Sequence, residues 1–185
     1  HTSRVGFGAW AVGGAGWRYT WGAQDDADSI ATIRHAVDSG VNWIDTAAVY
    51  GLGHSEEVVG KAISGLTDAD RPFVFTKVGL VWDDNDRAAA PKRIMAAASV
   101  RREVEDSLRR LNVERIDLYQ VHWPDTGASL DFSDPEGVDP AAATPLEEYW
   151  QTMADLVTEG KVRAIGLSNH TVPQLEIAES IAHVD

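Results

Sequence analysis

The spacing of five strand-like segments constrains the fold of this chain more than any other feature. β-Branched and aromatic residues concentrate in five stretches, a composition typical of strands: Val5–Trp10, Val41–Asp45, Phe73–Lys77, Ile116–His122 and Val162–Ser168. Consecutive stretches start 36, 32, 43 and 46 residues apart. Because each interval has room for a helix and two loops, the pattern predicts an α/β fold with a parallel sheet.

Helix signals fill the intervals between these strands. A helix is expected from Asp26 to a stop at Gly40, and Ser55 is expected to cap the next one. An apolar stripe that would pack on the sheet marks the third helix: Val100, Val104, Leu108 and Leu111. Thr144 and Thr171 each stand three residues before a Glu or Gln, which is the pattern of a capping box.

The composition is typical of one globular domain spanning residues 1–185, with an apolar fraction of 44%. The sequence contains no cysteine, which excludes disulfides, thiolate nucleophiles and cysteine-based metal sites. It has neither a run of about 18 apolar residues nor a secretory signal pattern, so we expect a cytoplasmic protein with no membrane partner. A formal charge of −13 argues against a nucleic-acid partner.

Polar residues stand where the predicted strands end. One apolar run ends in Asp45, another in Lys77, another in His122, and the last in Ser168 and Asn169. The carboxyl ends of parallel strands share one edge, and the loops that open there form the active face of α/β proteins. We therefore expect these side chains to converge on a site.

Each of these residues alone also has a structural interpretation. Asp45 could cap a helix, Lys77 could be a surface lysine, and His122 could be a hydrogen-bonded structural residue. Together, a carboxylate, an ammonium and an imidazole on a buried edge must satisfy one another. The Asp–Lys pair would keep the ammonium charged, and that charge would favour ionisation of a nearby phenol. Tyr50, followed by the turn residue Gly51, is the phenol within reach.

Two long loops interrupt the βα rhythm, and both follow predicted strands. Trp82–Pro91 is acidic and then alanine-rich, and Asp125–Ala143 is rich in Asp, Pro, Gly and Ala. Loops of this length inside a compact domain are usually functional. We interpret both as substrate-side loops.

These residues resemble the motifs of the aldo-keto reductases over essentially the whole chain. The first signature of that family is similar to Gly40, Asp45-Thr46-Ala47, Tyr50-Gly51, Glu56 and Gly60. Its lysine and histidine strands are similar to residues 73–77 and 117–123, and its fifth-strand signature to residues 160–169. Within that family, the chain resembles the branch of bacterial members that are similar to the potassium-channel β-subunits.

The resemblance implies a (βα)8 barrel that binds a nicotinamide dinucleotide, NADP(H) in preference to NAD(H), without a Rossmann domain. The glycine-rich stretch Gly13–Gly16 indeed lacks the Rossmann spacing. An NAD(P)-dependent oxidoreductase of this family would reduce small aldehydes or ketones, sugar-type carbonyls included. Tyr50 would donate the proton, Lys77 and Asp45 would tune its acidity, and His122 would orient the carbonyl.

The same resemblance assigns the cofactor side of the site. Ser168 and Asn169 would hold the nicotinamide carboxamide, with Asp45 close by. The turn Gly8-Ala9-Trp10 would lie beside the nicotinamide. Trp10, Trp82 and Trp123 are candidate walls of the substrate pocket, although each could equally belong to the core. No metal is expected.

The sequence also departs from the family pattern. Five βα units are present where the barrel has eight, so the chain is expected to hold only the first part of the fold. The family's N-terminal hairpin and the residues that grip the cofactor phosphates cannot be assigned. His170 stands where the family often has phenylalanine.

Three other interpretations remain open at this point. A cofactor-binding redox sensor or regulatory subunit with little turnover is the main alternative. Five strands in 185 residues also suit a doubly wound, flavodoxin-like sheet. A metal-dependent barrel hydrolase is disfavoured because no His-x-His follows the first strand.

Overall fold

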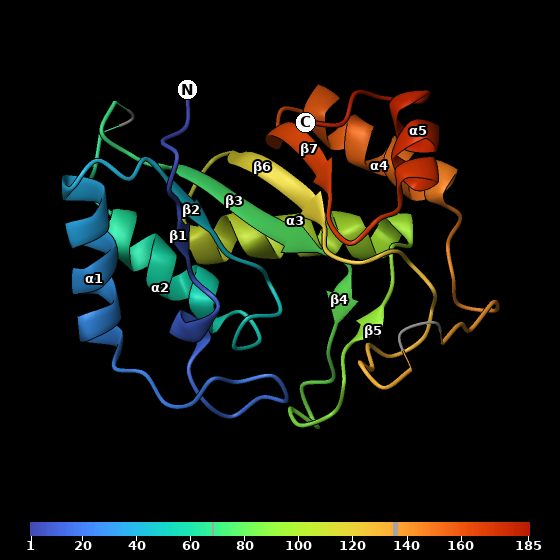
Figure 1. The fold of residues 1–185 in the computed structure, drawn as a ribbon, viewed down its shortest axis with the longest axis horizontal. Coiled ribbons are helices and arrows are strands. Elements are labelled where there is room, and N and C mark those ends of the chain that lie inside the picture. The colour runs from blue at the N-terminus through green and yellow to red at the C-terminus, as the bar shows by residue number, and fades with distance from the viewer. Residues whose placement is uncertain (68, 135–136) are drawn as a thin grey trace.

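The computed structural model describes residues 1–67, 69–134 and 137–185 (Figure 1). Five parallel strands form one sheet in the order β1-β2-β3-β6-β7. They are β1 (Phe7–Gly8), β2 (Trp43–Asp45), β3 (Phe73–Val78), β6 (Ile116–Val121) and β7 (Val162–Leu167). The order in space follows the order in the chain, so every crossover steps in the same direction. A flavodoxin-like sheet would reverse direction at a switch point, so that alternative is wrong.

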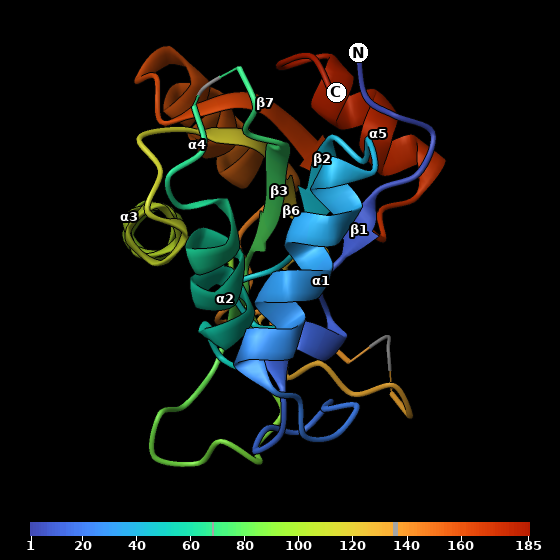
Figure 2. The same ribbon diagram turned by 90° about the vertical axis from the view of Figure 1, so that its left-hand side faces the viewer.

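Helices follow the strands as the sequence predicts. They are α1 (Asp26–Asp38), α2 (His54–Ile63), α3 (Ala97–Leu111), α4 (Leu146–Thr158) and α5 (Val172–Glu179). Each packs against the next, and Figure 2 shows α1, α2 and α3 side by side along one face of the sheet. Right-handed crossovers that all step one way place their helices on one face, as in a sector of a (βα)8 barrel. None of the helices within the described ranges is long and apolar enough to span a membrane.

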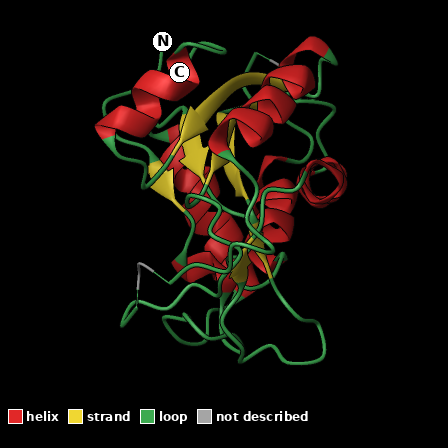
Figure 3. Cartoon of the chain, turned by 90° about the vertical axis from the view of Figure 1, so that its right-hand side faces the viewer, coloured by secondary structure: helices red, strands yellow, loops and turns green. Residues whose placement is uncertain are grey.

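Two short elements lie outside this βα pattern. A 3₁₀ turn, η1 (Ala11–Gly13), follows β1, and the hairpin β4 (Leu80–Val81) and β5 (Lys92–Arg93) follows β3. The hairpin carries the Trp82–Pro91 loop at its tip. Figure 3 shows the loops gathered at one end of the sheet, beyond the carboxyl ends of the strands.

Strand alternation separates the core from the site. In β3, Val74 and Val78 pack in the core, and Thr76 donates a 2.6 Å hydrogen bond to Glu56 on α2. Lys77 points to the opposite face, where it meets Asp45. The predicted stripe of α3 is confirmed: Val100, Val104 and Leu111 are fully buried, and Leu108 packs against the same cluster.

Several local predictions differ from the structure. The first strand is only Phe7–Gly8, not Val5–Trp10. Ser55 does not cap α2, because its buried hydroxyl donates to the Ala9 carbonyl instead. The capping box at Thr144 is also absent, since α4 begins after Pro145. The box at Thr171 is confirmed.

Candidate active site

A cavity of about 350 Å³ opens at the carboxyl ends of the strands. All four residues predicted for proton transfer line it: Asp45 on β2, Tyr50 in the loop after β2, Lys77 on β3 and His122 directly after β6. The cavity is also lined by four residues predicted for the cofactor or the pocket wall: Trp10, Trp123, Ser168 and Asn169. The convergence expected from the strand ends is therefore present in the structure.

Lys77 and Asp45 form the polar floor of this cavity. The Lys77 ammonium donates to Asp45 Oδ2 at 2.6 Å and to the Thr46 carbonyl at 2.8 Å. Gln120, which is in register with Lys77 on the neighbouring strand, donates to Asp45 Oδ1 at 3.3 Å. Burial lowers the pKa of Lys77, whereas the charge and hydrogen bond of Asp45 raise it. Two neighbouring strands thus hold the carboxylate in a fixed orientation.

Tyr50 reaches the cavity from a tight turn after β2. Its backbone N–H bonds the Ala47 carbonyl at 3.1 Å, and Gly51 follows with φ +65°. A Cβ on Gly51 would collide with the Gly13 carbonyl, and one on Gly13 would approach Gly51 N to 2.7 Å. Both positions must be glycine for these two backbone segments to pack so closely. The contact with the glycine-rich loop after β1 therefore fixes the Tyr50 turn.

The Tyr50 ring packs against several side chains of the site. Trp10 stacks on it with ring centroids 5.5 Å apart, and His122 meets it edge-on at 5.7 Å. The Lys77 ammonium lies 5.3 Å from its ring centre. Tyr50 and His122, which come from different βα units, therefore face one small volume at the cavity wall.

The electrostatics of Tyr50 differ from the expectation. Burial raises the pKa of the phenol, and the Asp45 charge raises it further, so the ammonium of Lys77 does not produce the predicted ionisation. The physical reason is that Lys77 is already paired with Asp45, whose negative charge would oppose a phenolate. Tyr50 therefore holds its proton.

His122 is uncharged in this site. Its ring is partly buried, and loss of solvent lowers the pKa of His122 to about 3, with the Lys77 charge acting in the same direction. A neutral imidazole has one donor and one acceptor nitrogen. His122 can thus donate a hydrogen bond without adding positive charge to the cavity.

Ser168 and Asn169 form the rim beside β6. The Ser168 N–H bonds the Val121 carbonyl at 2.9 Å. The Asn169 amide nitrogen donates to the His122 carbonyl at 2.8 Å and to Ser168 Oγ at 3.1 Å. These bonds use neither the Asn169 amide oxygen nor the Ser168 hydroxyl hydrogen. This rim therefore offers one acceptor and one donor.

Three predicted residues do not line the cavity. Ala9 is fully buried, Gly8 lies on the exposed edge strand, and only Trp10 of that turn reaches the site. Trp82 also lies outside the lining: its indole N–H donates to Asp84, and the Arg110 guanidinium covers its ring at 5.9 Å.

The two long loops contribute unequally. The Trp82–Pro91 loop contacts the turn after Tyr50 through Arg87, which donates to the Gly51 carbonyl at 3.4 Å, but it supplies no residue to the lining. The Asp125–Ala143 loop supplies Leu130 and Phe132, and its residues 135 and 136 lie outside the described part of the chain.

Sequence reasoning missed most of the aromatic lining. Trp17 and Tyr19, from the loop after β1, pack beside Tyr50, and the Tyr19 hydroxyl donates to the Leu130 carbonyl. A tryptophan and a tyrosine close together in a glycine-rich loop were the available signal. Gln120 was missed because nothing in its strand distinguishes it.

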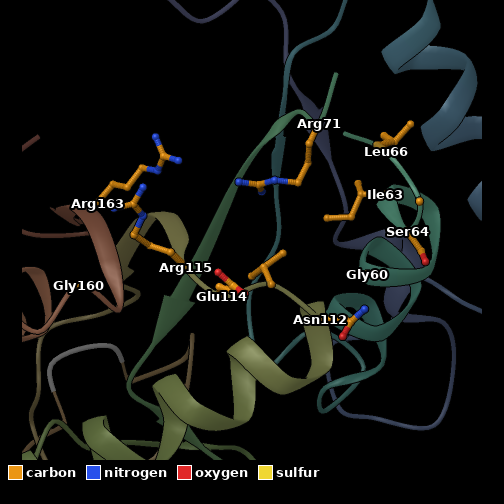
Figure 4. A pocket seen from close by; sticks show the side chains of 12 residues that line it. Gly60, Ile63, Ser64, Leu66, Arg71, Asn112, Glu114, Arg115, Gly160 and Arg163 are labelled. Atoms are coloured by element: carbon orange, nitrogen blue, oxygen red, sulfur yellow. The ribbon is translucent and has the colours of Figure 1, made fainter. Parts of the chain in front are cut away.

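A larger cavity of about 560 Å³ lies at the opposite end of the sheet (Figure 4). Arg71, Arg115 and Arg163 line it, but the buried Asp117 carboxylate lies 3.2 Å from Arg71 and 3.1 Å from Arg163. These ion pairs tie together the amino ends of the strands. In the described part of the chain, no group of three His, Cys, Asp or Glu side chains could hold a metal ion.

The comparison with known families agrees with the geometry of the first cavity. The model of the aldo/keto reductase family matches residues 4–185. This chain belongs to the aldo/keto reductase family. The family's barrel explains why the strand order is sequential and why the polar side chains meet at the carboxyl ends.

Other aldo/keto reductases resemble the chain over nearly all of its length. It is 36% identical to the NADH-specific methylglyoxal reductase of Escherichia coli (strain K12) over 176 residues, which cover 90% of this chain and 48% of that protein. Its fold matches a glycerol dehydrogenase from Gluconobacter oxydans with a TM-score of 0.78 and 42% identity, covering 99% of this chain and 50% of that one.

A third aldo/keto reductase is similar in structure and carries a cofactor. The enzyme from Klebsiella pneumoniae in complex with NADPH matches with a TM-score of 0.69 and 29% identity, covering 98% of this chain and 50% of that one. The chain spans about half the length of the relatives that it matches. Its five-stranded parallel sheet thus corresponds to part of their (βα)8 barrel.

Proposed function

We propose that residues 1–185 form a single partial (βα)8-barrel domain that carries the proton-transfer side of an NAD(P)H-dependent oxidoreductase. The substrate is a small aldehyde or ketone, with sugar-type carbonyls included, and the product is the alcohol. The observation that carries this proposal is the meeting of Tyr50 and His122 at one cavity wall, above the Lys77–Asp45 pair.

Tyr50 is the proton donor in this proposal. A bound nicotinamide would supply the hydride for the carbonyl carbon, and Tyr50 gives its proton to the carbonyl oxygen. The phenolate left behind lies beside the Lys77 ammonium and takes a proton back from solvent. Because burial raises the pKa of Tyr50, the phenol is protonated before the reaction, as a donor must be.

His122 orients the substrate. A neutral imidazole donates one hydrogen bond to the carbonyl oxygen, which stabilises the negative charge that develops there. Asp45 keeps Lys77 beside the phenol, since their hydrogen bond of 2.6 Å fixes the ammonium. Gln120 holds the other carboxylate oxygen.

The residues at the rim fit a nicotinamide. A carboxamide has an acceptor oxygen and a donor NH₂ group, and the rim offers the Ser168 hydroxyl as donor and the Asn169 oxygen as acceptor. We propose that these two residues hold the carboxamide, with Asp45 and the Gly8-Ala9-Trp10 turn close by.

NADP(H) is the proposed cofactor in preference to NAD(H). The family resemblance and the relative solved with NADPH support this choice. The relative named as NADH-specific makes NADH the competitor to test.

The cavity walls suggest a compact, largely apolar substrate. Trp10, Trp17, Tyr19, Trp123 and Phe132 surround the polar floor. Such walls favour the hydrocarbon part of a carbonyl compound and leave its oxygen to Tyr50 and His122.

Turnover by the full-length protein tests the proposal. Benzaldehyde, methylglyoxal and xylose are each supplied with NADPH or NADH, and cofactor oxidation is followed at 340 nm. Steady oxidation with at least one carbonyl, faster with NADPH, is the expected result. Tight cofactor binding without turnover would support the redox-sensor alternative, and no binding of either dinucleotide would overturn both.

A further inference from the structure

A hydrogen-bonded chain links α4 to the rim of the cavity through His170. The Tyr149 hydroxyl lies 2.9 Å from His170 Nε2, and His170 Nδ1 lies 2.7 Å from the Ser168 carbonyl oxygen. The two rings meet at 68° with centroids 6.2 Å apart. Neither side chain lines the cavity, and the proton-transfer proposal uses neither of them.

The partners fix the tautomer of His170. A carbonyl oxygen only accepts, so Nδ1 must carry the hydrogen that is donated to Ser168. Nε2 then has a free lone pair, and the Tyr149 hydroxyl must be its donor. Burial lowers the pKa of His170, although the Ser168 carbonyl raises it. Burial, with the Asp125 charge, raises the pKa of Tyr149. Both groups thus stay neutral, as the two hydrogen bonds require.

The hydrogen bonds end on a short segment after β7 that is held from two sides. Asn169 has φ +60°, a left-handed conformation that asparagine adopts more readily than most residues with a side chain. Its side chain ties the segment to the end of β6 through the His122 carbonyl. The His170 bond to the Ser168 carbonyl holds the segment from the other side, through Tyr149 on α4.

We propose that His170 is a positioning residue that sets the affinity of this site for the nicotinamide cofactor. The proposal rests on the assignment of Ser168 and Asn169 to the carboxamide. By fixing the Ser168 carbonyl, His170 holds the Ser168 hydroxyl and the Asn169 oxygen in the spacing that a carboxamide needs. Phenylalanine at this position would fill a similar volume but make neither hydrogen bond.

Three variants of the full-length protein separate hydrogen bonding from packing. His170→Phe keeps the ring volume and loses both bonds. His170→Asn keeps a donor close to the Nδ1 position and loses only the link to α4. Tyr149→Phe leaves His170 intact and removes its outer partner. Thermal unfolding of each variant shows whether it folds. If His170→Phe does not fold, Tyr149→Phe provides the test instead.

The readouts are the Kd for NADPH, from quenching of tryptophan fluorescence, and the kcat for benzaldehyde at saturating NADPH. His170→Phe is expected to raise the Kd about tenfold, the equivalent of one lost hydrogen bond, with kcat within about twofold. His170→Asn is expected to restore most of that affinity, and Tyr149→Phe to raise the Kd about threefold.

The possible failures are distinguishable. Wild-type affinity in His170→Phe and Tyr149→Phe, in a protein that turns over, would overturn the role of His170 alone. Equal losses in His170→Phe and His170→Asn, or a fall in kcat without a change in Kd, would also overturn it. A wild-type protein that binds neither NADPH nor NADH would overturn the proposed function itself.

Discussion

Glu56 offers the clearest test of how the fold supports the site. This carboxylate is fully buried and joins three elements: Thr76 on β3 donates to Oε1 at 2.6 Å, and Arg110 on α3 donates to Oε2 at 2.6 Å. Glu56 itself lies on α2, directly after the Tyr50 turn. Replacing it with alanine removes the carboxylate that pairs directly with the Arg110 guanidinium, whose side chain is 13% exposed.

The magnitude follows from this burial. Breaking a buried ion pair by removing one partner costs about 3–5 kcal/mol of the free energy of unfolding. In a domain of this size each kcal/mol lowers Tm by about 2–4 °C, so Glu56→Ala should lower Tm by about 10 °C. Urea unfolding followed by circular dichroism measures the free energy, and calorimetry measures Tm.

A matched surface pair provides the control. Glu105, whose side chain is 55% exposed, pairs with Lys161, and Glu105→Ala should cost under about 1 kcal/mol. The double variant Glu56→Leu with Arg110→Met should recover part of the loss, because no charge is left buried. The reasoning would be refuted if Glu56→Ala and Glu105→Ala lost similar amounts of stability.

Three further predictions concern the site and its loops. Gly51→Ala should destabilise the Tyr50 turn by about 1–3 kcal/mol and lower turnover, because its Cβ would meet the Gly13 carbonyl; a fully active, equally stable variant would contradict this. Asp125→Ala should lower the free energy of unfolding in urea by about 2–3 kcal/mol, because the carboxylate accepts hydrogen bonds from the backbone N–H groups of Met95, Gly127 and Thr144. A loss near zero would contradict this. The pKa of His122 is about 3 in the folded protein and 6.5 as an ordinary value, so between these values the unfolded chain binds more protons than the folded one. The free energy of unfolding should therefore fall as pH drops through that window. A His122→Asn variant with the same pH slope would refute this.

The sequence predicted the parts of the fold that depend on short-range pattern. Strand positions followed from β-branched runs, and the stripe of α3 followed from helical spacing. The site was predictable because parallel strands end at one edge, and this rule alone is enough to make Asp45, Lys77 and His122 neighbours.

The missed features depend on contacts between distant segments. As a cap, the Ser55 hydroxyl oxygen would accept from a backbone N–H of the helix, but the hydroxyl instead donates to the Ala9 carbonyl, 46 residues away. Trp82 was predicted in the pocket wall, but Arg110 and Asp84 hold it outside. The Tyr50 pKa was predicted in the wrong direction, since burial and the geometry of the Lys77–Asp45 pair decide it.

The central claim is that Tyr50 delivers the proton. The most direct measurement is the single-turnover rate of NADPH oxidation by benzaldehyde in the Tyr50→Phe variant, together with its Kd for NADPH. We expect a rate at least about 10²-fold slower than wild type, with the Kd within about twofold, because phenylalanine keeps the ring that lines the cavity and packs on Trp10. A variant that retained the wild-type rate would contradict the account.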